Sequence, residues 1–228
     1  GGYGNGDGQL NEPNQLAFAP NGNLHVVEYN NHRISIFTRD GEFVKTFGSN
    51  GTGDGQFKNP VGVTVASNGE IFVADQNNHR IQVFDSNGTF LRKWGSSGNN
   101  DNQFRYPEGI VIGPDDLVYV SSHDHSKVKV FQKNGTYVRS FDTTDKCNDL
   151  CLIGNRIAVG YGNNHRVRIY ETNGTLVREI SGFDRLRGVA VDGNGTIYVT
   201  TRNKVHAYDQ DGNSLWQVGA EYHGGGGG

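Results

Sequence analysis

Apolar and polar residues alternate with a period of two along most of the chain, as they do in strands that bury one face. The stretch from residue 59 to residue 95 shows this pattern best and predicts strands over 62–66, 70–75, 80–85 and 89–95. Ser-Asn-Gly separates the first strand from the second and the third from the fourth, and Gln-Asn-Asn-His separates the middle two. Asn-Gly supplies the positive φ that a tight hairpin needs. The stretch is therefore predicted to be a four-stranded antiparallel meander.

The same pattern returns along the whole chain. The pentapeptide NNHRI occurs at Asn30–Ile34 and Asn77–Ile81, and NNHRV occurs at Asn163–Val167. The basic residue of this motif recurs at intervals of 47, 47, 39 and 38 residues, and a downstream Asn-Gly or Asp-Gly turn keeps the same intervals. The five basic residues are Arg33, Arg80, Lys127, Arg166 and Lys204. Two independent markers in one register identify a repeat, and this period is typical of a solenoid, propeller or array.

One meander cannot bury both of its faces, but meanders that stack and close into a ring can. We therefore expect an all-β fold, a β-propeller of four-stranded antiparallel blades, with a linear array as the alternative. Gly1 and Gly219 lie at the same phase of the repeat, which favours five blades, or six if one blade lies outside this chain. The expected repeats are 1–47, 48–94, 95–141, 142–180 and 181–219, followed by a linker-like tail at 220–228.

Residues 59–95, NPVGVTVASNGEIFVADQNNHRIQVFDSNGTFLRKWG, resemble an NHL repeat. The similarity is close in the first two repeats and looser afterwards, and the fifth repeat (TTRNKVHAY) lacks the Asn-His pair. NHL repeats occur in tripartite-motif (TRIM) proteins, in bacterial sensor kinases and, more distantly, in an amidating lyase. The resemblance to the tripartite-motif proteins implies a propeller whose loop face binds RNA or protein partners.

Composition narrows the class of protein. With 34 Gly, 5 Pro and 34% hydrophobic residues, the chain suits a β fold rich in tight turns and not a disordered chain. The net charge of −3 gives no general attraction to nucleic acid, and two cysteines exclude a disulfide scaffold. No apolar run reaches the roughly 18 residues of a membrane span. We expect a cytoplasmic, monomeric propeller that does not contact a membrane and needs no cofactor.

The repeated Asn-His-Arg motif is predicted to be structural. Three histidines on separate blades lie too far apart to share one metal ion. Asn is expected to adopt the left-handed turn conformation, and the Arg is expected to pair with carboxylates such as Asp75 or Glu28. His123, Asp124 and His125 could be considered a metal site, but neighbouring segments offer no further ligands, so we expect no metal. Ser121 and Ser122 lack the Gly-x-Ser-x-Gly frame of an activated serine.

Positions that vary between repeats at the loop face are the better candidates for ligand binding. They are Tyr29, Gln76, Arg105, His123, Tyr161, Arg187 and Arg202. Mixed charge and exposed aromatic residues favour a non-catalytic module that docks a protein or peptide partner. RNA binding is the alternative, since aromatic rings stack on bases and Arg meets phosphates, although acidic residues share this face. An enzyme resembling the amidating lyase is not expected, because no convergent histidine set is found.

Overall fold

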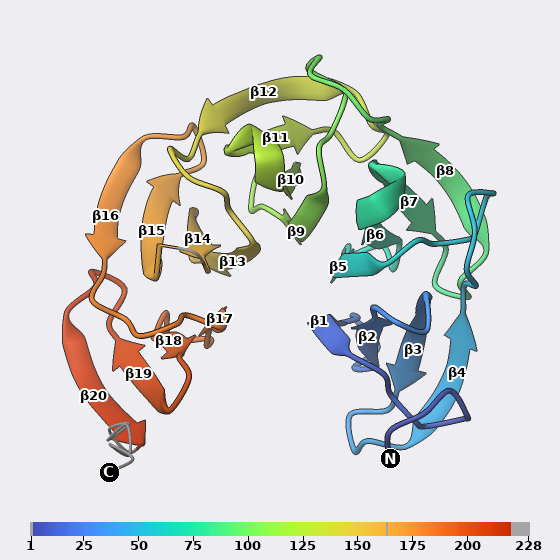
Figure 1. Ribbon diagram of the computed structural model, residues 1–228, viewed down its shortest axis with the longest axis horizontal. Helices are drawn as coiled ribbons and strands as arrows, with labels where there is room; N and C mark the ends of the chain where they lie inside the picture. Colours follow the sequence, from blue (N-terminus) through green and yellow to red (C-terminus); the bar gives the residue numbers. More distant parts are fainter. Residues whose placement is uncertain (1, 163, 220–228) are drawn as a thin grey trace, which may run out of the picture. The chain divides into compact units, whose positions relative to one another are not determined.

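The computed structural model describes residues 2–162 and 164–219 and is almost entirely β. Its strands form five four-stranded antiparallel sheets, and neighbouring strands in each sheet follow chain order. These sheets are the five blades of a β-propeller (Figure 1), which confirms the fold class expected from the sequence. Gly1 and the tail at 220–228, on which two of the sequence predictions fall, lie outside the described residues.

The chain divides into two compact units, Gly1–Lys146 and Cys147–Gly228. The first unit holds blade 1, with strands β1 (Pro13–Phe18), β2 (Leu24–Glu28), β3 (Arg33–Phe37) and β4 (Phe43–Phe47). Blade 2 has β5 (Pro60–Val65), β6 (Ile71–Asp75), the 3-10 turn η1 (Gln76–Asn78), β7 (Arg80–Phe84) and β8 (Phe90–Trp94). Blade 3 has β9 (Pro107–Ile112), β10 (Val118–Ser122), the 3-10 turn η2 (His123–His125), β11 (Lys127–Phe131) and β12 (Tyr137–Asp142).

The second unit holds the other two blades. Blade 4 has β13 (Asp149–Ile153), β14 (Arg156–Tyr161), β15 (Arg166–Glu171) and β16 (Leu176–Ile180). Blade 5 has β17 (Gly188–Val191), β18 (Ile197–Thr200), β19 (Lys204–Tyr208) and β20 (Ser214–Gly219). The strands predicted for the second repeat agree with β5 to β8 to within one or two residues, because the period-two pattern and the Asn-Gly turns are strong signals there.

Blades of the first unit are packed face to face through the two sides of their strands. In β6, Ile71 and Val73 belong to the apolar cluster shared with blade 1, while Phe72 and Ala74 belong to the cluster shared with blade 3. Since successive side chains of a strand point to opposite faces, a blade between two others reads as a continuous apolar run. Gly62 in β5 is required by this packing, because a Cβ there would lie 2.1 Å from the carbonyl oxygen of Glu108.

In the second unit, one apolar cluster joins its two blades. Val167 and Ile180 of blade 4 pack with Leu186, Val189 and Val199 of blade 5, and all five are buried. The helical segments η1 and η2 are each three residues long, and the part of the chain described above contains no helix with the length and apolar character needed to span a membrane.

Candidate functional site

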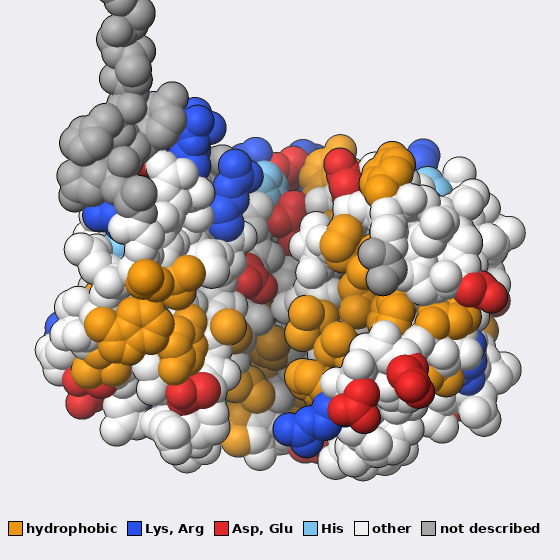
Figure 2. Space-filling view, turned by 90° about the horizontal axis from the view of Figure 1, so that it is seen from below, with side chains coloured by type: hydrophobic (Ala, Val, Ile, Leu, Met, Phe, Trp, Pro, Cys, Tyr) orange, Lys and Arg blue, Asp and Glu red, His pale blue; other side chains and the backbone are white. Residues whose placement is uncertain are grey.

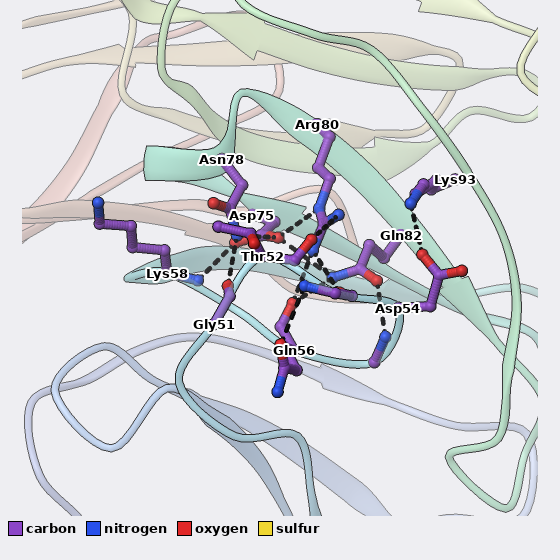
Figure 3. Close-up of polar contacts among 12 residues, drawn as sticks. Gly51, Thr52, Asp54, Gln56, Lys58, Asp75, Asn78, Arg80, Gln82 and Lys93 are labelled. Atoms are coloured by element: carbon purple, nitrogen blue, oxygen red, sulfur yellow. Dashed lines mark hydrogen bonds and ion pairs between the residues drawn. The ribbon is translucent and has the colours of Figure 1, made fainter.

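The repeated Arg sits in a buried polar network, which Figure 3 shows for blade 2. Asp75, at the end of β6, is fully buried and accepts a hydrogen bond of 2.7 Å from Arg80 Nε. Its carboxylate also accepts from Asn78 Nδ2 at 2.9 Å, from Gln82 Nε2 at 3.1 Å and from the backbone N–H of Lys58 at 2.8 Å. Four donors satisfy this buried carboxylate, as burial of a charge requires.

The other end of Arg80 organises the Gly-rich segment that precedes blade 2. Its guanidinium donates to the backbone carbonyls of Thr52, Gly53 and Gln56, each at 2.8 Å. The five guanidinium donors in a fixed fork suit this set of acceptors. One Arg side chain therefore joins the loop between β6 and β7 to the loop between β4 and β5.

Blade 1 repeats this network with a different acid. Arg33 Nε donates to the fully buried carboxylate of Glu28 at 2.7 Å, and Asn31 and Ser35 donate to the same carboxylate. Arg33 also donates to the carbonyl of Asn5 at 2.7 Å. The prediction that the motif Arg pairs with Asp75 or Glu28 is confirmed, and the motif is structural in both blades.

The motif His, and not the Asn, adopts the left-handed conformation, so that detail of the sequence prediction is wrong. His32 has φ of 52° and His79 has φ of 55°. The imidazole of each motif His also accepts a backbone hydrogen bond. His32 Nδ1 accepts from the backbone N–H of Asn59 at 3.0 Å, and His79 Nδ1 accepts from that of Tyr106 at 3.2 Å. Each His thus bonds to the start of the following blade. Burial lowers the pKa of both rings, which favours the neutral form that can accept.

Blade 3 lacks most of the carboxylate–Arg network that blades 1 and 2 share. Ser122 stands at the position of Asp75, since Ser122 pairs with Lys127 as Asp75 pairs with Arg80. Lys129 is buried, and its ammonium donates to the carbonyl oxygens of Asn100 at 2.8 Å and Asp101 at 3.3 Å. Burial lowers the pKa of Lys129 to about 8. The cation that holds the preceding loop has therefore moved two residues along the third strand of the blade.

With that anchor moved, the loop of blade 3 carries a titratable cluster, His123, Asp124 and Lys146. His123 Nδ1 lies 3.0 Å from Asp124 Oδ1, and Lys146 Nζ lies 2.6 Å from the same oxygen. The side chain of His123 is 18% exposed and that of Asp124 is 29% exposed, so the cluster is shielded but reachable. The hydrogen bond from Lys146 lowers the pKa of Asp124, which keeps its carboxylate ionised.

Backbone hydrogen bonds fix this cluster to the loop before β9. The N–H of His123 donates to the carbonyl of Tyr106 at 3.1 Å, and the N–H of Asp124 donates to that of Arg105 at 3.3 Å. The ring of Tyr106 packs edge-on against His79, with centroids 4.8 Å apart. A rigid frame of this kind holds a reacting side chain in one geometry.

His125 does not join the cluster. Its Nδ1 bonds to Ser122 Oγ at 2.9 Å and its Nε2 to Asn99 Oδ1 at 3.2 Å, so both ring nitrogens have partners. Burial is the main reason that its pKa is lowered. Across residues 2–162 and 164–219, no three His, Cys, Asp or Glu side chains are arranged to hold a metal ion.

Four of the candidate residues from the sequence lie in the first unit. Tyr29, Gln76 and His123 occupy equivalent positions, each just after the second strand of its blade, and all three are half-buried. Gln76 donates to Glu108 Oε1 at 2.8 Å, while Arg105 is exposed next to the cluster. The structure thus places the backbone of Arg105 next to that of Asp124, while the charge of Arg105 acts on His79 and His125.

Tyr161 is not at the mouth where the sequence placed it. It pairs with Arg166 as Asp75 pairs with Arg80, so it takes the position of the buried carboxylate. Its ring is fully buried and its hydroxyl lies 2.9 Å from that of Tyr170. Tyr161 therefore offers no exposed ring to a ligand.

Arg187 and Arg202 of blade 5 are exposed, and the N–H of Arg202 donates to the carbonyl of Asp184 at 3.3 Å. Lys146 is the residue of the cluster that sequence reasoning missed. It lies in the connection between β12 and β13, which is shorter than the connections that precede blades 2 and 3, so it has no counterpart in those blades. The loop of blade 3 departs from the motif, and a basic residue outside the repeat pattern was the sequence signal that could have pointed to Lys146.

Comparison with known proteins places the fold among characterised propellers. Residues 57–84 match the NHL repeat. This match supports the resemblance to NHL repeats, but it does not support a specific resemblance to the tripartite-motif proteins. A comparison with curated protein sequences found no match.

Several solved structures share the fold. A streptogramin B lyase is 15% identical over 92% of this chain and 70% of its own, with a TM-score of 0.71. A catalytically inactive His-to-Ala variant of virginiamycin B lyase from Staphylococcus aureus, solved with quinupristin, is 14% identical over 92% of this chain and 70% of its own, with a TM-score of 0.72. A protein of unknown function from Bacteroides caccae is 17% identical over 92% of this chain and 82% of its own, with a TM-score of 0.69. Identities this low establish a common fold.

These neighbours correct the functional expectation drawn from the sequence. The chain was expected to be a non-catalytic module that docks a protein or peptide partner, with RNA as the alternative, and not an enzyme. The similar structures include lyases, and nothing in the comparisons supports a docking module. The expectation rested on the resemblance to tripartite-motif proteins and on the lack of a convergent histidine set, and neither excludes catalysis by one histidine and a carboxylate.

Proposed function

We propose that this chain is a catalytic propeller of the lyase type, with His123 as its general base. The observation that carries the proposal is the 3.0 Å contact between His123 Nδ1 and the Asp124 carboxylate on the loop face. The solved structures that share the fold support it, since two of them are named as lyases.

The contact with Asp124 orients the imidazole for this role. An ionised carboxylate at Nδ1 favours the tautomer with its proton on Nδ1, which leaves the lone pair of Nε2 free to accept a proton. The carboxylate also stabilises the imidazolium that forms when the base is protonated. Lys146 keeps Asp124 ionised, so it acts as a positioning residue.

Elimination proceeds in this site as follows. His123 Nε2 takes a proton from a carbon next to a carbonyl, and the C–H electron pair becomes a C=C bond. The group on the neighbouring carbon leaves with its own bonding pair, and the imidazolium returns a proton to it. Negative charge builds up on the carbonyl oxygen meanwhile, and we assign its stabilisation to the exposed Arg105, whose backbone carbonyl accepts from the N–H of Asp124.

The experiment follows quinupristin and simple β-substituted carbonyl compounds by mass spectrometry and NMR in D₂O. Quinupristin is chosen because it was solved with a propeller of this fold. Elimination that opens a ring leaves the mass unchanged, whereas hydrolysis adds one water. We also expect deuterium to enter at the carbon next to the carbonyl, since a base exchanges that proton even without elimination.

The variants separate catalysis from structure. His123→Ala should abolish turnover and exchange, and Asp124→Asn should lower both by about 10²-fold or more, because loss of a positioned base or its partner typically costs this much. Gln76→Ala changes the equivalent position of blade 2 and should have no effect on either. The proposal fails if the wild-type protein neither eliminates nor exchanges any of these compounds, or if His123→Ala keeps full activity.

A further inference from the structure

The Gly-rich loops that precede the three blades of the first unit share one fold but differ in what anchors them. A parallel bridge closes each loop, joining Tyr3 to Leu10, Asn50 to Phe57 and Ser97 to Phe104. A cation from the third strand of the blade donates to backbone carbonyls of each loop, and it is Arg33, Arg80 or Lys129. We call residues 49–59 the second loop and residues 96–106 the third loop.

The two arginine anchors have a buried counter-charge, whereas Lys129 does not. Arg33 and Arg80 each donate to a fully buried carboxylate. In blade 3, Ser122 takes the place of that carboxylate. Within residues 2–162 and 164–219, the hydrogen bonds of Lys129 Nζ go only to backbone carbonyls, those of Asn100, Asp101 and Gln103. The third loop is therefore held by an ammonium whose hydrogen-bond partners are all neutral.

Lys129 is also shielded from water. Figure 2 shows Lys and Arg side chains on the surface of the protein, where water solvates them, but Lys129 is only 3% exposed. Its ammonium lies 5.9 Å from the ring centroid of Phe104, in the third loop. Its neighbours across the sheet, Val120 on β10 and Ser140 on β12, carry no charge. Burial without a bonded counter-charge disfavours the ammonium form of a lysine.

The titratable groups around Lys129 do not cancel this effect. Burial is the largest influence on the pKa of Lys129 and lowers it from 10.5 to about 8. Asp101, in the third loop, opposes the shift, and Lys127, on the same strand, adds to it. The third group is His125 in η2, whose pKa is lowered from 6.5, mainly by burial and next by the charge of Lys129, so its ring is neutral above pH 7.

The third loop also has weaker hydrogen bonds than the second. The bond that the N–H of Gly98 donates across the third loop is 3.4 Å long, which is beyond the usual range, whereas the bond from Gly51 across the second loop is 3.0 Å. In blade 2, Gln82 accepts from the N–H of Gly55 at 3.0 Å. Lys129 stands at the place of Gln82, and an ammonium cannot accept. The third loop is therefore the easier of the two to open.

We propose that the third loop is a gate, which opens independently of the second loop and closes more firmly when Lys129 loses its proton. Opening returns the ammonium to water, and this offsets part of the cost of breaking its three hydrogen bonds. Arg80 gains less in this way, because Asp75 already compensates its charge. The gate does not depend on the proposed lyase activity.

The gate controls the frame of the candidate site. The backbone carbonyls of Arg105 and Tyr106 belong to the third loop and accept hydrogen bonds from the loop that carries His123. Opening of the third loop breaks these bonds and frees the loop face of blade 3.

The direction of the pH effect follows from proton linkage. In the open loop Lys129 is in water and keeps its proton up to its ordinary pKa of 10.5, whereas in the closed loop it releases the proton near pH 8. Between these values the open form binds more protons, so a rise in pH favours the closed form.

Hydrogen exchange of the backbone amides, read by mass spectrometry of loop peptides, tests the gate. Each rate is divided by the intrinsic rate of the same peptide at the same pH, which gives the opening equilibrium. At pH 7 the amide of Phe104 should be open more often than that of Phe57, its equivalent in the second loop. Between pH 7 and pH 9 the opening of the third loop should decrease about tenfold, as a pKa of about 8 when closed and 10.5 when open requires. The opening of the second loop should not change, since arginine keeps its charge in this range.

Three variants connect the effect to Lys129. Lys129→Gln gives blade 3 the neutral side chain that blade 2 has at this position, so the change in opening between pH 7 and pH 9 should disappear. Ser122→Asp/Lys127→Arg/Lys129→Gln transfers the anchor of blade 2 and should lower the opening of the third loop at pH 7 to that of the second. Lys133→Gln is the matched control: Lys133 pairs with Asp116 beyond the far end of β11, so this variant should keep the pH effect.

The proposal is overturned if the third loop of the wild-type protein opens no more than the second at pH 7, or if its opening stays constant or increases between pH 7 and pH 9. It is also overturned if Lys129→Gln keeps the decrease, or if Lys133→Gln abolishes it. Both loops are read in the same sample, so a variant that loses stability as a whole shows increased exchange in both. The wild-type comparison then decides alone.

Discussion

The network around Asp75 allows a quantitative test of what holds the first unit together. Asp75→Asn keeps the size and shape of the side chain but places an NH₂ group or a neutral oxygen where Arg80 Nε now donates at 2.7 Å. The side chain of Arg80 is only 8% exposed, so its guanidinium loses its counter-charge in a buried site. Removing one partner of a buried ion pair typically costs about 3 to 5 kcal/mol.

Thermal unfolding converts this into a measurable shift. For a protein of this size about 1 kcal/mol corresponds to roughly 2 to 4 °C, so Asp75→Asn should lower the unfolding temperature of the first unit by roughly 6 to 20 °C. The chain has two tryptophans, Trp94 in the first unit and Trp216 in the second. A Trp216→Phe background therefore makes Trp94 fluorescence a reporter of the first unit alone, which matters because two units need not unfold together.

An exposed ion pair drawn in the same close-up (Figure 3) supplies the control. Asp54 and Lys93 are 53% and 44% exposed, and Asp54→Asn should cost less than about 1 kcal/mol, as exposed pairs do. The combined change of Asp75→Asn and Arg80→Met should cost less than the sum of the two single changes, since the second removes the stranded charge. If Asp75→Asn costs no more than Asp54→Asn, the reasoning about the buried network is refuted.

Two further predictions concern the turns. Gly88 and Gly41 have φ of 76° and 86°, but a Cβ at Gly88 would lie 2.7 Å from the ring of Phe47, while a Cβ at Gly41 would meet nothing within 4 Å. Gly88→Ala should therefore lower the unfolding temperature clearly more than Gly41→Ala, and equal effects would contradict this packing. His79 has a pKa lowered by burial from its ordinary value of 6.5, so it contributes stability above that pH that is lost as pH falls through the lowered pKa. Urea titrations between neutral pH and pH about 5 should show that acid destabilises His79→Asn less than the wild-type protein. If the two proteins lose stability equally over this range, the hydrogen bond from Tyr106 does not depend on the neutral ring.

The features that the sequence predicts best are those carried by residues that recur in the repeat. The strands of blade 2 and the pairing of Arg80 with Asp75 follow from residues that recur at fixed spacing. Tyr161 was aligned one residue too late: it precedes Arg166 by the same interval as Asp75 precedes Arg80, so the repeat spacing itself assigns it to the buried carboxylate position. Lys146 was missed, because its contact with Asp124 depends on the path of the short connection between β12 and β13, which the repeat pattern does not determine.

Which neighbour covers the apolar side of a blade also escapes sequence reasoning. Leu16 and Val63 stand at the same place in the repeat and have the same apolar character, so the pattern predicts burial for both. Val63 is 1% exposed because blade 1 packs over it, whereas Leu16 belongs to the first blade of its unit and has no preceding blade of that unit beside it. A periodic pattern reports which side of a strand is apolar, but the neighbour that covers it depends on the number and order of the blades.

The altered anchor of blade 3 has a consequence for how such a repeat protein can evolve. In blades 1 and 2 the residues after the second strand are constrained, because a carboxylate must meet the Arg that holds the preceding loop. Lys129 holds that loop from within the third strand, at 2.8 Å from the carbonyl of Asn100. Mutation and selection can then act on His123 and Asp124 without loss of the scaffold, so the relocated lysine leaves the loop of blade 3 open to changes that the networks of blades 1 and 2 would oppose.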